Sequence, residues 1–249
     1  MSVSLDTCEE IQPAYEPHRT PLFLIHDGGG TIFSYHLLGD FDRQVFGISN
    51  PCFEHGNFDG GVHELALLYA GFIKSKVTES EVLIGGWSFG GMLALEISHI
   101  LSTDDNVRVK GQIYIDSPYP GNTQPVGLEV APAGTNFAPT TKSEVRDNVN
   151  RCMDDARRMV SDWTLPTWQT GPPPTVLLRA RDPVYQRGSG KVARVDFARD
   201  DPLLGWSNYG YNFIRETHEV SGDHYKVFKF EYLDDITEKI KEACEYLDR

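Results

Sequence analysis

The stretch that decides the fold spans residues 82–101 and reads VLIGGWSFGGMLALEISHIL. It opens with an aliphatic run typical of a strand buried on both faces, and it closes with a run that is apolar almost all round, as in a helix packed on a sheet. Between them lies Gly86-Trp87-Ser88-Phe89-Gly90, a single Gly-x-Ser-x-Gly. In a strand-to-helix elbow of this kind, a Cβ at either glycine would collide with a neighbouring strand or helix. Ser88 is therefore a candidate nucleophile.

A strand-then-helix rhythm extends outward from this stretch. Together with the elbow, the pattern predicts strands over residues 21–25, 44–49, 82–87, 109–115, 175–178 and 217–220, and helices over residues 65–73, 92–101 and 233–247. Such alternation indicates a mostly parallel sheet with helices on both faces. We expect one α/β domain over residues 1–249.

Composition narrows the classes of function. The 249 residues are 40% hydrophobic, which is enough for a sizeable core, and 23 basic against 36 acidic residues give a net charge of −13. This charge opposes binding to nucleic acid or to an anionic membrane. We find no signal peptide or membrane-spanning run, so we expect a cytoplasmic protein. The four cysteines, at 8, 52, 152 and 244, lack metal-ligand spacing, and we expect no metal site.

The pattern breaks between Asp116 and Thr175. Proline and glycine dominate residues 118–139, and three prolines occupy positions 172–174. Apolar residues at helical spacing within this part predict a helix over residues 145–159. Long insertions in compact domains usually serve function, so we interpret residues 117–174 as a helical lid insertion. An ordinary surface helix is the alternative.

A serine nucleophile needs a base and an acid that orients the base. His224 follows the last predicted strand, where a loop can reach the carboxyl edge of a parallel sheet. Two acids are open from position alone. Asp116 ends one predicted strand, and Asp182 follows another, although Arg181 beside Asp182 also fits a simple salt bridge.

Backbone N–H groups must stabilise the oxyanion that forms during acyl transfer. Phe89, directly after Ser88, supplies one, and the loop of Asp27 and Gly28–Gly30 is placed to supply the other. A phosphate-binding loop is the rival interpretation. The run lacks the Lys-Ser/Thr ending of a P-loop and the dinucleotide spacing, so we favour the oxyanion role.

Four segments together resemble a known family. They read LFLIHDGGG (22–30), GGWSFGG (85–91), YIDSP (114–118) and GDHY (222–225). In this order they are similar to the type I thioesterase domains of polyketide and nonribosomal peptide synthases, especially fungal ones, within the α/β-hydrolase superfamily. The resemblance implies an α/β-hydrolase fold and assigns the acid to Asp116. We then expect the site to comprise catalytic Ser88, Asp116 and His224, an oxyanion hole of Phe89, Asp27 and Gly28, and substrate contacts from Gly29, Trp87, Met153 and Tyr225.

The resemblance also implies a reaction and a partner. An acyl chain on the phosphopantetheine of a carrier protein would pass to Ser88 and leave by hydrolysis or by cyclisation, lactone-forming or Claisen-type; no cofactor of the enzyme itself is implied. Carrier proteins are commonly acidic. Residues 179–199 hold six basic and two acidic side chains, and we expect them, with the arginines of the insertion, to form the docking surface. An esterase or cyclase for free small molecules is the main alternative, and a non-catalytic binding module would require a broken triad.

Overall fold

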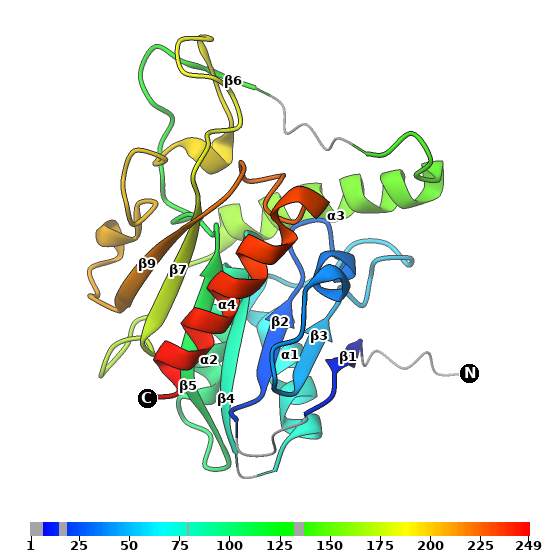
Figure 1. Ribbon diagram of the computed structural model, residues 1–249, viewed down its shortest axis with the longest axis vertical. Coiled ribbons are helices and arrows are strands. Elements are labelled where there is room, and N and C mark those ends of the chain that lie inside the picture. Colours follow the sequence, from blue (N-terminus) through cyan, green and yellow to red (C-terminus); the bar gives the residue numbers. More distant parts are fainter. Residues whose placement is uncertain (1–6, 15–18, 79, 132–136) are drawn as a thin grey trace.

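A seven-stranded sheet forms the centre of the molecule (Figure 1). The computed structural model describes residues 7–14, 19–78, 80–131 and 137–249. The strand order β1-β3-β2-β4-β5-β7-β9 joins strands that are all parallel except for β1, which is antiparallel to β3. The strands are β1 (Cys8–Gln12), β2 (Leu22–Ile25), β3 (Val45–Ile48), β4 (Ser80–Trp87), β5 (Val107–Ile115), β7 (Thr175–Ala180) and β9 (Ile214–Val220). The predicted mostly parallel sheet is confirmed.

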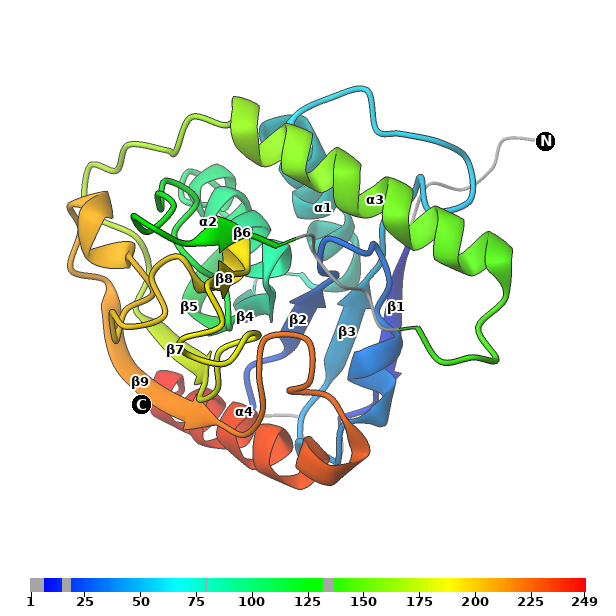
Figure 2. The ribbon, with the colours of Figure 1, turned by 90° about the horizontal axis from the view of Figure 1, so that it is seen from above.

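The central strands are buried on both faces, and their residues alternate between two cores. In β2, Phe23 and Ile25 belong to one apolar cluster, whereas Leu22 and Leu24 belong to the other. Helices α1 (Val62–Lys76) and α2 (Phe89–Leu101) cover the first face, and α4 (Leu233–Leu247) covers the second (Figure 2). The apolar stripes predicted for α1 and α4, and the run predicted to be apolar almost all round for α2, therefore account for the two layers. Within the described part of the chain, no helix is both long and apolar enough to cross a membrane.

Helix α3 (Ser143–Asp162) crosses above the end of the sheet at which the parallel strands terminate (Figures 1 and 2). It contains the helix predicted over residues 145–159. Two short strands that the sequence did not predict, β6 (Glu129–Val130) and β8 (Lys191–Val192), pair in parallel. They tie the predicted insertion to the connection between β7 and β9. Residues 132–136 of the predicted insertion lie outside the described residues.

The corner between β4 and α2 is packed so closely that it excludes side chains. A Cβ on Gly86 would lie 2.5 Å from the carbonyl oxygen of Ile25, at the end of neighbouring β2. A Cβ on Gly90 would meet that same oxygen and would lie 2.8 Å from the carbonyl oxygen of His26. The steric reason for the two glycines of the motif is confirmed.

Gly90→Ala should therefore destabilise the protein by about 3 kcal/mol, because its methyl group meets backbone that cannot rotate away. Gly71 in α1 is a matched control, since a Cβ there has nothing within 4 Å. Gly71→Ala should stabilise by about 0.5–1 kcal/mol through helix propensity. Urea unfolding of both variants measures the contrast. Equal effects of the two substitutions would contradict the steric argument.

Candidate active site

Ser88 lies on a strained corner between β4 and α2. Its backbone has φ 55° and ψ −112°, a combination that costs a non-glycine residue about 1–3 kcal/mol. The Ser88 N–H donates to the carbonyl oxygen of Ile115 at 2.9 Å, which ties the corner to the end of β5. Helix α2 begins at Phe89, and the first N–H groups of a helix have no partners within it. The geometry is that of the predicted elbow.

Asp116 occupies the corresponding place on the next strand. Trp87 and Ile115 are register partners in β4 and β5, so Ser88 and Asp116 follow them as neighbours at the same sheet edge. Asp116 also has positive φ, 42°, and its N–H donates to the carbonyl oxygen of Leu178 in β7 at 2.6 Å. Its side chain is fully buried. The backbone at Ile115 and Asp116 is thus held by hydrogen bonds on both sides of β5.

His224 comes to Asp116 from a tight loop after β9. Its Nδ1 lies 2.7 Å from Asp116 Oδ2, and because an ionised carboxylate only accepts, Nδ1–H is the donor. The neutral imidazole then keeps Nε2 as an acceptor. The ring centroid of His224 lies 5.7 Å from that of Trp87, the residue before Ser88. The structure therefore brings the three predicted segments together.

Asp182 lies in a different environment. Its carboxylate is 51% exposed and lies 3.6 Å from Arg181 Nε. Its N–H donates to the carbonyl oxygen of Gly222 at 3.0 Å, so the residue braces the loop that carries His224. Of the two acids that the sequence left open, only Asp116 is hydrogen-bonded to His224 among the bonds of the described residues.

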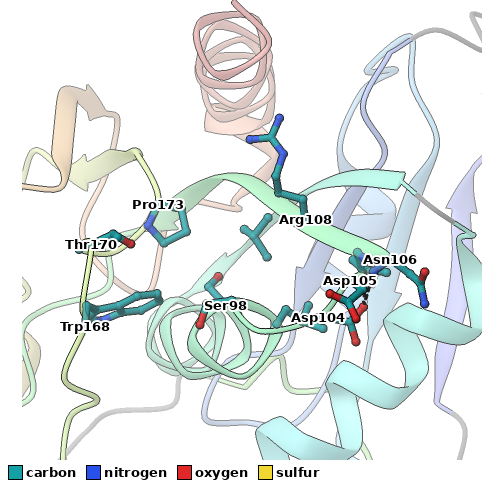
Figure 3. A pocket seen from close by; sticks show the side chains of 13 residues that line it. Ser98, Asp104, Asp105, Asn106, Arg108, Trp168, Thr170 and Pro173 are labelled. Carbon is teal, nitrogen blue, oxygen red and sulfur yellow. Dashed lines mark hydrogen bonds between the residues drawn. The ribbon is translucent and has the colours of Figure 1, made fainter.

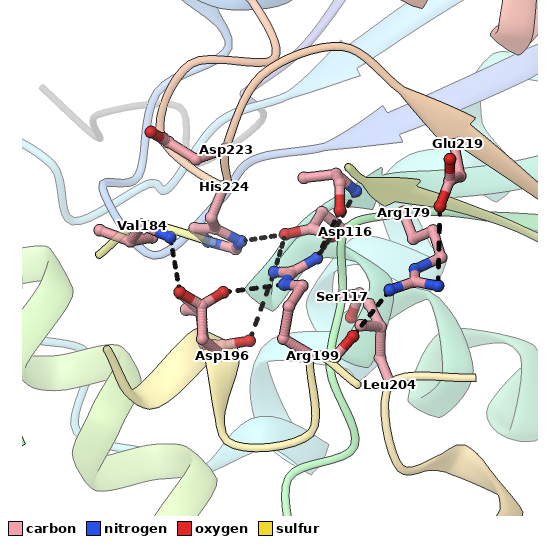
Figure 4. A network of polar contacts seen from close by, with 12 residues as sticks. Asp116, Ser117, Arg179, Val184, Asp196, Arg199, Leu204, Glu219, Asp223 and His224 are labelled. Atoms are coloured by element: carbon pink, nitrogen blue, oxygen red, sulfur yellow. Dashed lines mark hydrogen bonds and ion pairs between the residues drawn. The ribbon is translucent and has the colours of Figure 1, made fainter. Parts of the chain in front are cut away.

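Sequence reasoning missed the strongest partner of Asp116, which is Arg199. We expected Arg199 on an exposed docking surface, and that expectation is wrong: its side chain is 6% exposed, and both of its terminal nitrogens donate to the Asp116 carboxylate (Figure 4). Burial alone would raise the pKa of Asp116, but the hydrogen bonds from Arg199 and His224 hold that pKa well below its usual range. Nothing in the local sequence distinguishes this arginine from its exposed neighbours.

The glycine loop after β2 folds back on itself. Gly30 N–H donates to the Asp27 carbonyl oxygen at 3.1 Å, and Gly29 N–H donates to Asp27 Oδ1 at 3.0 Å. These two N–H groups are occupied within the turn, and the oxyanion hole of Phe89, Asp27 and Gly28 stays a prediction. Burial lowers the pKa of His26 to about 4 and raises that of Asp27 to about 6.

Helix α3 packs directly on this loop. A Cβ on Gly28 would lie 2.9 Å from Met153 Sδ, and one on Gly30 would lie 3.0 Å from Cys152 Sγ. Tyr225, another predicted substrate contact, lies edge-on to His224 with ring centroids 5.0 Å apart. The residues predicted to contact substrate thus gather around the loop, the elbow and the histidine.

The proposed basic surface is smaller than the sequence suggests. Arg179 is also half-buried, and it donates to the carbonyl oxygen of Arg199 at 2.7 Å. In α3, Arg151 and Arg158 donate to backbone carbonyls of the loop at residues 52–60 instead of facing solvent freely. Within residues 179–199 the exposed cations are Arg181, Arg187, Lys191 and Arg194, and in α3 Arg157 and Arg158 are also exposed.

A separate pocket of about 350 Å³ lies far from Ser88, Asp116 and His224 (Figure 3). It is lined by the end of α2, the start of β5 and the loop of Trp168 and Pro173. Helix α2 has 13 residues, so its two ends are about 20 Å apart. This pocket is not part of the site around Ser88.

Asp27→Asn should change the pH dependence of stability. The folded-state pKa of Asp27, about 6, lies above the usual 3.8, so the folded protein binds more protons than the unfolded chain between these values and loses stability as the pH rises through them. Asparagine keeps an oxygen for Gly29 N–H but does not titrate. The stability of the variant relative to the parent should rise from pH 4 to pH 6 by up to about 3 kcal/mol.

Urea unfolding across this pH range tests the expectation. Exposed Asp105→Asn is the control and should give a flat difference. A flat difference for Asp27→Asn as well would show that its carboxylate is not destabilised by burial.

Comparisons with known proteins show the family to which the chain belongs. Residues 20–162 match the family model described as Thioesterase domain. The chain is 37% identical over 238 residues to the probable thioesterase BOA10 of Botryotinia fuckeliana, covering 92% of this chain and 85% of that protein. It is 38% identical over 240 residues to the thioesterase frbD of a Dothideomycetidae species, covering 92% and 90%.

Solved structures share the fold at lower identity. The NocB thioesterase domain from the nocardicin cluster superimposes with a TM-score of 0.71 at 22% identity, covering 96% of this chain and 99% of that one. The Vlm2 thioesterase domain, solved with a bound dodecadepsipeptide, gives 0.69 at 15% identity, covering 96% and 98%. The sheet and its helices are therefore those of α/β-hydrolase-type thioesterase domains, and the chain belongs to the thioesterase domain family.

Proposed function

We propose that this thioesterase releases an acyl chain, polyketide or peptide, from the phosphopantetheine of a carrier protein through an ester on Ser88. The observation that carries the proposal is the 2.7 Å hydrogen bond from His224 to buried Asp116, beside a serine on a strained elbow. A serine hydroxyl is a weak nucleophile near neutral pH, and an oriented imidazole is the usual means of activating it.

The first half of the reaction forms the acyl-enzyme. Ser88 Oγ attacks the thioester carbonyl while His224 Nε2 takes the hydroxyl proton. The oxyanion is stabilised by the N–H of Phe89 and by the loop of Asp27 and Gly28. The C–S bond then breaks, and the departing pantetheine sulfur receives the proton from His224.

The second half releases the product. Water or a nucleophile within the acyl chain attacks the Ser88 ester, His224 accepts its proton, and the C–O bond to the serine breaks as the serine regains that proton. Since the same triad serves both routes, the choice between acid and ring depends on what surrounds the acyl chain. Helix α3 acts as the lid in this proposal, because Met153 and Cys152 contact the glycine loop directly.

The names of related proteins support the same class of reaction. Both fungal relatives above are called thioesterases, and the structural neighbours are thioesterase domains, one of them solved with a depsipeptide. A synthase or its carrier protein is accordingly the partner that we propose.

Ser88→Ala should lower release of an acyl chain from a loaded carrier by at least about 10³-fold, since removal of a triad nucleophile costs this much or more. Ser102→Ala, at the exposed end of α2, is the matched control and should keep parental activity. The measurement is mass spectrometry of the released product and of the acylated protein. An acyl adduct that persists in Ser88→Ala would reject the nucleophile, and preference for an oxygen ester over the matched thioester would favour a small-molecule esterase instead.

The exposed cations of the β7–β9 connection should receive the carrier. Reversing Arg187, Lys191 and Arg194 to glutamate should raise KM for a carrier-loaded substrate about tenfold at low salt, because charge complementarity chiefly affects encounter. Turnover of a short acyl-thiol mimic should not change. Arg108→Glu, on an arginine at the opposite end of the sheet with 70% of its side chain exposed, shows the effect of one such charge reversal away from this surface. Unchanged KM in the triple variant would remove this surface from the proposal.

A further inference from the structure

The buried guanidinium of Arg199 donates hydrogen bonds to both oxygens of the Asp116 carboxylate (Figure 4). Arg199 Nη1 donates to Oδ1 at 2.6 Å and Nη2 donates to Oδ2 at 2.8 Å. The same Oδ2 accepts His224 Nδ1–H at 2.7 Å, and Oδ1 also accepts Ala180 N–H at 2.7 Å. Two parallel charge-assisted bonds fix the plane of a carboxylate, which a lysine ammonium cannot do. The plane of Asp116 in turn fixes the direction in which His224 is held.

The remaining donors of Arg199 are also satisfied. Nε donates to Asp196 Oδ1 at 2.8 Å, and Nη1 donates to the Ala180 carbonyl oxygen at 3.0 Å. The other oxygen of Asp196 accepts Val184 N–H at 2.7 Å. Asp196 is itself buried, with 7% of its surface exposed. Because an unpaired buried charge would be strongly destabilising, the many specific partners of buried Arg199 show that it is an integral part of the site.

The charges of this group set an electrostatic balance around His224. Asp116 and Asp196 contribute two negative charges and Arg199 one positive charge, which gives 1 − 2 = −1. When His224 accepts the proton of Ser88, its positive charge brings the sum to zero. Loss of Arg199 would leave −2 and favour the imidazolium, whereas loss of the Asp196 charge would leave zero and disfavour it.

Other titratable groups near His224 are the same in the parent protein and in variants of Arg199 and Asp196. Asp27 acts on His224 through space from the glycine loop. Tyr225 stays neutral, because burial raises its pKa to about 12, and Asp223 is ion-paired with Lys226. None of these is hydrogen-bonded to Arg199 or Asp196 among the bonds of the described residues. Substitutions of Arg199 and Asp196 should therefore affect His224 chiefly through Asp116.

We propose that Arg199 is a positioning residue that fixes the Asp116 carboxylate and, balanced by Asp196, tunes the basicity of His224. The inference rests on the proposed function in taking Ser88 as the nucleophile. It predicts that two substitutions within one ion-pair network have opposite effects on the pH dependence of that nucleophile.

The test follows the rate of Ser88 labelling by a fluorophosphonate as a function of pH, a reaction that needs no thioester. In Arg199→Met the midpoint of the acidic limb should move up by about one pH unit, and in Asp196→Asn it should move down by a similar amount. Arg199→Lys keeps the positive charge but loses the pair of parallel hydrogen bonds to the Asp116 carboxylate. Its midpoint should stay near that of the parent while its maximal rate falls by about 10²-fold, the cost of a misplaced group.

Matched controls separate position from charge number. Arg108→Met and Asp105→Asn make the same changes at exposed positions at the other end of the sheet, and they should leave the profile unchanged. Urea unfolding reports whether each variant folds. If Arg199→Met does not fold, the unshifted midpoint of Arg199→Lys and the downward shift of Asp196→Asn still carry the test.

The outcomes are distinct. Shifts of the same sign in Arg199→Met and Asp196→Asn, or unshifted profiles with only a loss of stability, would show a purely structural role and overturn the proposal. Failure of the parent protein to be labelled at Ser88 would instead reject the nucleophile. Opposite shifts without turnover of carrier-bound thioesters would uphold Arg199 as a positioning residue and reject the proposed substrate.

Discussion

The site depends on a contact that excludes every side chain, where the carbonyl oxygen of Ile25 meets the corner between β4 and α2. Gly86 and Gly90 both face this oxygen with no room for a Cβ. The glycine loop that follows Ile25 is consequently held against the serine corner. Helix α3 packs on the other side of this loop, where the side chain of Met153 occupies the space that a Cβ on Gly28 would need. The corner and the loop are thus in backbone contact, which fixes their spacing, and α3 adds side-chain contacts on the outer side of the loop.

Much of this could be predicted from the sequence because the signals are local. The aliphatic runs, the helical stripes and the Gly-x-Ser-x-Gly each reflect the immediate packing of a single element, and the closing helix, α4 (Leu233–Leu247), has the bounds that its apolar spacing predicts. Strand β1 escaped prediction because it is an edge strand, CEEIQ, with polar side chains, and backbone bonds to β3 hold it in place. Strands β6 and β8 were not predicted, because a strand of two residues is too short to show an alternation of apolar and polar side chains.

Arg199 could not be found from the sequence for a physical reason. A charged residue looks the same in a sequence whether it faces solvent or a buried carboxylate, and its partner Asp116 is 83 positions away. The run of basic residues at 179–199 favours an exposed surface by composition alone. Folding separates them: Arg199 turns inward, Arg179 braces it through the Arg199 carbonyl oxygen, and only the outer cations are left for a partner. The family resemblance implies the class of partner, and the burial of each basic side chain decides whether it can contact that partner.

Strain and buried charge are concentrated at the same two strand ends, and this links the fold to the chemistry. Ser88 and Asp116 both have positive φ, and each is held there by a hydrogen bond from its own N–H to the next strand in the sheet. The sheet therefore sustains a conformation that neither residue would adopt alone. Asp116 carries the additional demand of a buried charge, which the fork of Arg199 meets from outside the sheet. A strained backbone fixes where the serine and the carboxylate lie, and a buried ion pair fixes how the carboxylate is oriented. The histidine comes from a loop, the least constrained of these segments, and its hydrogen bond to Asp116 makes its orientation depend on both constraints.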